Sequence, residues 1–128
     1  MTKPEIIDET LAYYLADPKG RRLIAGPQRK CAYRKIDGRM CAVGRCLLDP
    51  GRFTGTTCTI TTLITVGGQD LDALLRPEYR GHSLEFWVAL QMFHDLETNW
   101  TDTGLTGPGA YALRQLRETW GAAPVRWT

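Results

Sequence analysis

A histidine–aspartate pair and a cysteine are the residues whose types could carry out catalysis. His94 precedes Asp95, and Cys41 lies between Arg39 and Arg45 in the chain. Histidine is the common general base near neutral pH, a carboxylate can orient it, and neighbouring cations favour the reactive thiolate of a cysteine. These residues therefore allow a hydrolase or transferase that uses His94 and Asp95, with or without Cys41 as nucleophile, provided that the fold gathers them into one pocket.

Basic residues are concentrated in one part of the chain. Residues 19–52 carry ten basic and two acidic side chains, a net charge of +8, within a chain whose total is only +2. Guanidinium groups match phosphate and carboxylate geometry, and an aromatic ring offers a stacking surface for a base. We therefore predict an anion-binding surface formed by Tyr33, Arg34, Arg39 and Arg45, with His94 as a further binding residue. The alternative is a solvated basic loop that pairs with the acidic N-terminal residues.

The four cysteines do not have the spacing of a typical zinc site. Structural zinc sites usually contain two cysteines separated by two to four residues, and only Cys41 and Cys46 come near this pattern. We expect buried thiols at these positions and no bound metal or other cofactor. A zinc-binding interaction domain is kept as an alternative.

Three segments have the sequence pattern of helices. Residues 3–16 follow Thr2, which forms a capping-box pattern with Glu5. Residues 84–97 follow a capping Ser83 and are apolar on almost every side, which indicates the central buried helix. A last helix is predicted over residues 108–120, beginning at a proline. A short helix is predicted near residues 71–75.

The remaining segments indicate a small β structure. Asp37-Gly38 is typical of a tight hairpin turn and separates two short strand-like runs, so that Arg34 would oppose Cys41 and Tyr33 would oppose Ala42. Residues 53–66 are rich in β-branched side chains, which favours a strand, and residues 19–30 are interpreted as a loop. The predicted fold class is α+β, with three principal helices packed against a small antiparallel hairpin or sheet.

Length and composition predict one domain over residues 1–128. No apolar run approaches the ~20 residues of a membrane-spanning helix, and the first residues lack the pattern of a signal peptide. We therefore expect a cytoplasmic protein that makes no membrane contact and whose cysteines are reduced.

Two parts of the sequence resemble a group of small bacteriophage and prophage proteins. The first is Cys31-x-Tyr33-Arg34, Asp37-Gly38 and Cys41-Ala42-Val43-Gly44; the second is Leu90-Gln91-x-x-His94-Asp95, followed by Trp100. The resemblance implies a viral or mobile-element origin and a place in the host cytoplasm, and it implies no particular reaction.

These observations lead to a function prediction. Small phage proteins often act by binding a host component, so we predict a non-enzymatic binding protein that engages an anionic host target, either the surface of a defence protein or a nucleotide, through the basic hairpin face. Nucleic acid is a further candidate partner. The alternatives are the small hydrolase or transferase and the zinc-binding domain described above.

Overall fold

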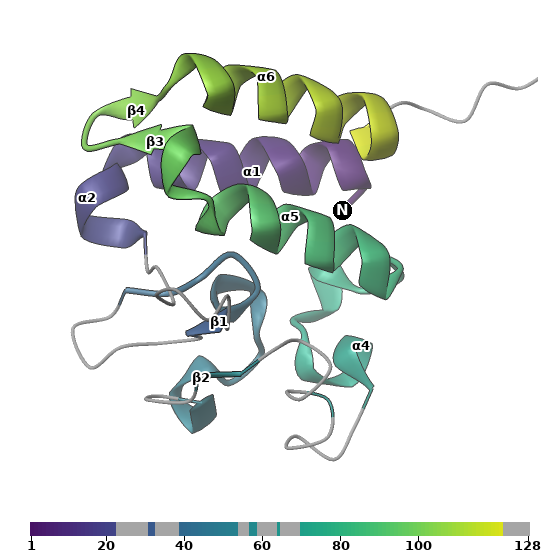
Figure 1. Cartoon of the computed structure of the whole chain (residues 1–128). Coiled ribbons are helices and arrows are strands. Elements are labelled where there is room, and N and C mark those ends of the chain that lie inside the picture. Colours follow the sequence, from purple (N-terminus) through teal and green to yellow (C-terminus); the bar gives the residue numbers. More distant parts are fainter. Residues whose placement is uncertain (23–30, 33–38, 54–56, 59–63, 65–69, 122–128) are drawn as a thin grey trace, which may run out of the picture.

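The computed structural model describes residues 1–22, 31–32, 39–53, 57–58, 64 and 70–121. Its three longest helices are α1 (Lys3–Ala16), α5 (Leu84–Asp95) and α6 (Gly107–Leu116). Figure 1 shows α6 running alongside α1, with α5 next to both and the paired strands β1 and β2 on the far side of α5. The three predicted helices are confirmed, although the second ends at Asp95 and the third at Leu116.

Each long helix begins at a side-chain cap. Thr2 and Glu5 form the predicted capping box, in which the Thr2 hydroxyl accepts from the Glu5 backbone N–H and the Glu5 carboxylate accepts from the Thr2 N–H. Ser83 and Thr106 accept the backbone N–H three residues further on, at the starts of α5 and α6. These bonds satisfy donors that the helix itself leaves unpaired, and they fix where each helix starts.

Short elements connect the long helices. Two four-residue helices, α2 (Pro18–Arg21) and α4 (Leu71–Leu74), lie within connecting segments, and Glu97–Asn99 forms a 3₁₀ turn after α5. Strand β1 (Cys31–Ala32) pairs antiparallel with β2 (Thr57–Cys58), and β3 (Trp100–Thr101) pairs with β4 (Gly104–Leu105). A π-helical turn, Arg117–Gly121, continues α6. The fold is α+β, as predicted.

The second strand of the predicted hairpin is not formed. Met40 makes only an isolated parallel bridge with Arg22, and Gly44–Cys46 is a 3₁₀ turn. Val43 has helical backbone angles, and its N–H is bonded to a side chain of α5 instead of to a neighbouring strand. Cys31 pairs instead with Cys58 of strand β2, which lies within the Thr-rich residues 53–66. Residues 33–38, which include the predicted Asp37-Gly38 turn, lie outside the described part.

The core is built around α5. Its side chains Phe86, Trp87 and Leu90 are buried against apolar residues of α1 and of the segment that follows Met40. The start of α6 approaches the 3₁₀ turn after α5 closely: a Cβ added to Gly109 would lie 2.0 Å from the Asn99 carbonyl oxygen, so only glycine fits there. In the described residues, no helix combines the length and the apolar character needed to cross a bilayer.

Candidate functional site

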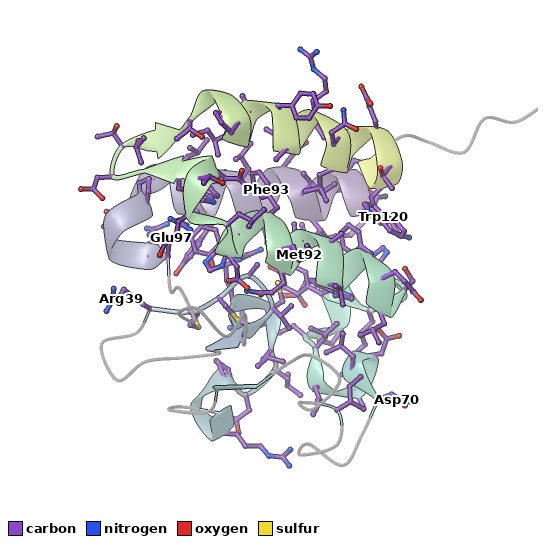
Figure 2. The ribbon with its side chains drawn as sticks, viewed as in Figure 1. Arg39, Asp70, Met92, Phe93, Glu97 and Trp120 are labelled. Atoms are coloured by element: carbon purple, nitrogen blue, oxygen red, sulfur yellow. The ribbon has the colours of Figure 1, made fainter. Side chains whose placement is uncertain are left out.

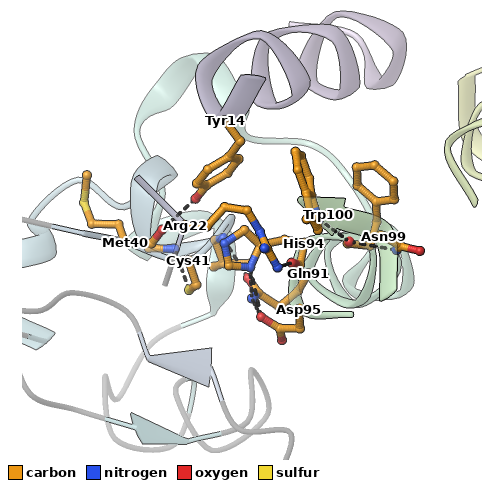
Figure 3. Close-up of polar contacts among 12 residues, drawn as sticks. Tyr14, Arg22, Met40, Cys41, Gln91, His94, Asp95, Asn99 and Trp100 are labelled. Atoms are coloured by element: carbon orange, nitrogen blue, oxygen red, sulfur yellow. Dashed lines mark hydrogen bonds and ion pairs between the residues drawn. The ribbon is translucent and has the colours of Figure 1, made fainter. Parts of the chain in front are cut away.

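Two distant parts of the chain meet at a buried polar cluster. The backbone N–H of Val43 donates to Oε1 of Gln91 on α5 at 3.0 Å, and Nε2 of Gln91 donates to Oδ1 of Asp95 at 2.8 Å. The Gly44 N–H donates to Sγ of Cys41 at 3.3 Å. The segments 41–44 and 90–95 are therefore in direct contact (Figure 3).

His94 lies at the centre of this cluster and is 0% exposed. Its Nδ1 donates to Oδ1 of Asp95 at 2.9 Å, while its Nε2 is buried and has no hydrogen-bond partner among the described residues. The Tyr14 ring packs against it, with 4.7 Å between ring centroids. Burial lowers the pKa of His94 and outweighs the opposing effect of Asp95. The imidazole is therefore neutral near pH 7 and is held in one tautomer.

Arg22 reaches the cluster from the end of α2. Its Nη2 donates to the carbonyl oxygen of His94 at 2.7 Å, and its guanidinium lies 4.8 Å from the centroid of the Trp100 ring. Its Nε is buried with no acceptor among the described residues. Desolvation lowers the pKa of Arg22 despite the attraction of Asp95 and other neighbours. Arg22 therefore carries a half-buried positive charge whose desolvation is incompletely compensated.

Two more arginines lie beside Arg22. Nη1 of Arg21 donates to the Tyr13 carbonyl oxygen at 3.0 Å, and its guanidinium lies 4.5 Å from the Tyr13 ring centroid. The parallel bridge between Arg22 and Met40 brings Arg39 alongside, and Figure 2 shows the Arg39 side chain at the edge of the molecule. We call Arg21, Arg22 and Arg39 the arginine edge.

The first two arginines of this edge lack an acidic partner in the described structure. Among the described residues neither Arg21 nor Arg22 forms an ion pair with a carboxylate; both donate to backbone carbonyls and stack on aromatic rings. The residues outside the described part contain one acidic side chain, Asp37, and five basic ones. Because a guanidinium has five donors, each group keeps donors that could bind an anion.

The prediction that Arg45 faces water on a basic hairpin face is wrong. Arg45 is 8% exposed: Nη1 pairs with Oε1 of Glu9 at 2.6 Å, and Nη2 donates to the Thr10 hydroxyl at 2.6 Å. Burial disfavours its charge, but the surrounding ionisable groups, Glu9 among them, raise the pKa of Arg45 above its usual range. This arginine joins the 3₁₀ turn after Cys41 to α1, so its role is structural.

The remaining predicted site residues fall into three groups. Tyr33 and Arg34 lie outside the described residues. Arg39 is partly exposed, on the arginine edge. His94 and Asp95 are bonded to each other, and the turn that contains Cys41 is bonded to the same cluster through Gln91, but Cys41 and His94 are fully buried (Figure 3).

The described residues hold no group of three or more His, Cys, Asp or Glu side chains arranged to bind a metal. Cys41 and Cys46 are buried thiols, and burial raises the pKa of Cys46 to about 12, which keeps it protonated. Cys41 and Cys46, the pair whose spacing comes nearest to that of a zinc site, therefore belong to no such ligand set in this part of the chain.

Arg21 and Arg22 are the residues that the sequence analysis did not select. They belong to the basic segment but lie in residues 19–30, which were interpreted as a loop, whereas residues 18–21 form α2. Their aromatic partners come from distant parts of the chain: Tyr13 belongs to α1 and Trp100 to β3. Only the local charge could have drawn attention to this pair.

The chain was compared with protein-family models, curated proteins and solved structures, and no significant match was found in any of the three comparisons.

Proposed function

We propose that this protein is a non-enzymatic binding protein that engages an anionic target through its basic segment, with Arg22 at the centre of the contact. The observation that carries the proposal is the state of Arg22: a half-buried guanidinium, stacked on Trp100, whose acceptor is a backbone carbonyl and whose pKa is lowered by desolvation. An anion placed against this group would complete the compensation that Asp95 and other neighbours provide only in part.

The chemistry of the target follows from the donors. A guanidinium presents paired N–H groups that match a phosphate or a carboxylate, and the guanidinium groups of Arg21 and Arg22 each lie over an aromatic ring, which restricts them before binding. The target is therefore an anion with two accessible oxygens, such as a nucleotide phosphate or an acidic side chain of a host protein. The resemblance to phage proteins supports a host partner in the cytoplasm.

The test is a calorimetric titration of the purified protein with inorganic pyrophosphate, AMP and a glutamate-rich peptide. We expect at least one of these probes to bind, with an affinity that falls as salt is raised. Arg22→Gln and Arg39→Glu should each weaken binding about tenfold or more. Arg114→Gln, which removes an exposed arginine of α6, is the matched control and should bind like the parent protein.

Two results would overturn the proposal. One is the absence of heat with every probe at low salt. The other is an unchanged affinity in Arg22→Gln while its unfolding transition stays cooperative, because the anion would then bind elsewhere.

A catalytic function is the second candidate, favoured by one specific observation. Asp95 orients His94 from one side, and the buried Nε2 on the other side lacks a partner among the described residues, which is the arrangement of a general base. Cys41 would be the nucleophile of a hydrolase or transferase. Mass spectrometry after brief iodoacetamide treatment of the native protein tests this: rapid alkylation of Cys41 that His94→Gln abolishes would support catalysis, and an inert Cys41 would eliminate it.

A further inference from the structure

One face of α5 is apolar and exposed, although the rest of this helix forms the core. Val88 and Met92 of α5 and Leu96, the C-cap residue that follows it, are spaced four residues apart and are 38%, 51% and 42% exposed; the Leu96 N–H still donates to the Met92 carbonyl oxygen. Residues with this spacing form a row along a helix, and eight residues correspond to about 12 Å of helix length. We call these three residues the α5 stripe. Figure 2 shows Met92 along α5 and Glu97 just beyond its end.

The stripe belongs to a rigid surface. Phe86, Trp87 and Leu90 of the same helix are buried in the core, so α5 cannot turn to hide the stripe without losing that packing. Single exposed apolar residues are common on protein surfaces, but a continuous row on a fixed helix is typical of a surface that binds another helix.

Acidic residues flank the stripe at both ends. Glu85 lies one turn before Val88, and Glu97 follows Leu96; residues 84–97 contain three carboxylates and no lysine or arginine. Among the described residues no ion pair neutralises Glu85 or Glu97, although Arg22 attracts Glu97 at longer range. A complementary surface therefore has an apolar row with cationic residues beyond its ends.

The same charges argue against a second copy of this chain as the occupant. In a symmetric dimer that packs α5 against α5 in antiparallel fashion, Glu85 of each copy would approach Glu97 of the other. A parallel arrangement would bring each glutamate next to its own counterpart. Like charges meet in both cases, which costs free energy.

We propose that the α5 stripe binds an amphipathic helix of a partner protein, with apolar residues at i, i+4 and i+8 and lysine or arginine on both flanks. The Glu97 end of the stripe lies near the arginine edge, because Arg22 donates to the His94 carbonyl oxygen and attracts Glu97. The two proposals are still distinguishable, because Met92→Asp changes only the stripe and Arg22→Gln changes only the arginine edge.

The experiment uses two synthetic helical peptides with the same three leucines at i, i+4 and i+8, one with lysine flanks and one with glutamate flanks. Fluorescence anisotropy should show binding of the lysine peptide and at least tenfold weaker binding of the glutamate peptide. Met92→Asp should weaken lysine-peptide binding about tenfold or more. Tyr111→Asp, which changes a 64% exposed residue on α6, is the matched control and should leave the affinity within twofold.

A charge exchange tests the flanks separately. The double variant Glu85→Lys/Glu97→Lys should reverse the preference and bind the glutamate peptide more tightly. The proposal is overturned if neither peptide binds, if both bind equally, or if Met92→Asp has no effect. It is also overturned if sedimentation shows a dimer that Met92→Asp dissociates, or if the protein binds lipid vesicles through the stripe.

Discussion

Arg22 and Arg45 belong to the same basic segment of the chain but are treated in opposite ways by the fold. Arg45 is buried with Glu9 and Thr10 as partners, and its pKa is raised. Arg22 is half-buried, donates to a carbonyl, stacks on Trp100, and its pKa is lowered. The first charge is satisfied inside the protein, whereas the second is desolvated without an acidic partner in the described structure. Local charge density in the sequence therefore does not identify which arginine is available for binding. The hydrogen-bond and ion-pair partners of each guanidinium in the structure identify it.

The largest effect is expected when the satisfied arginine is removed. Arg45→Met takes the cation from Glu9 and removes the donor to the Thr10 hydroxyl, while Tyr79 keeps its own bond to Glu9, so we expect the free energy of unfolding to fall by about 3 kcal/mol. Urea denaturation measures this change. Arg114→Met, at an exposed position, should change the stability by less than about 0.5 kcal/mol. A loss below about 1 kcal/mol in Arg45→Met would show that Arg45 is not the structural cation.

The next effect concerns the Gln91 hydrogen bonds that hold the cluster near Arg22. Gln91→Leu removes the acceptor of the buried Val43 N–H and the donor to Asp95, and we expect a loss of about 2 kcal/mol. The neighbouring exposed change Met92→Leu should be close to neutral in the same denaturation assay. Equal stability of both variants would mean that the 41–44 turn does not depend on Gln91.

A pH dependence should distinguish the cluster around His94 from the ion pair of Arg45. Burial lowers the pKa of His94 in the folded state below its ordinary value of 6.5, so the unfolded chain binds the proton more readily. The stabilising contribution is complete above pH 6.5 and is lost as the pH falls below it, by at most about 1.4 kcal/mol per pH unit.

Urea midpoints measured between pH 5.5 and 8 test this slope. His94→Gln should flatten it, and His82→Gln, which changes the other histidine of the chain, should leave it in place. A slope that survives in His94→Gln would assign the proton uptake to another group.

The smallest effect on stability is expected for the arginine that we assign to binding. Arg22→Gln loses a hydrogen bond and a cation–π contact but also removes a desolvated charge, and these changes oppose each other. We expect the free energy of unfolding to change by less than about 1 kcal/mol. A loss as large as that of Arg45→Met would remove the distinction between the two arginines.

The sequence predicted the helices more successfully than the site. Caps, a proline and apolar periodicity are local features, so Thr2, Ser83 and Pro108 located the starts of α1, α5 and α6 within a residue. The second strand of the hairpin was also predicted from a local pattern, and it is not formed. The Val43 N–H donates to the Gln91 side chain, 48 residues away in the chain, and a local pattern contains no information about such a contact.

The convergence of Cys41 with His94 was left open, and the contrast between Arg22 and Arg45 could not be predicted. Their difference depends on Glu9 and Trp100, which come from elements far away in the chain. Tyr33 and Arg34 remain predictions, because the described residues do not include them.

The central claim is that Arg22 binds an anion, and nitrogen-15 NMR of the arginine side chains during a pyrophosphate titration tests it most directly. The Arg22 Nε–H resonance, assigned by its disappearance in Arg22→Gln, should shift in a saturable manner. The Arg45 resonance should stay in place, because its guanidinium is bonded to Glu9 and Thr10. A saturable shift at Arg45 with none at Arg22, or no shift at either, would contradict the account.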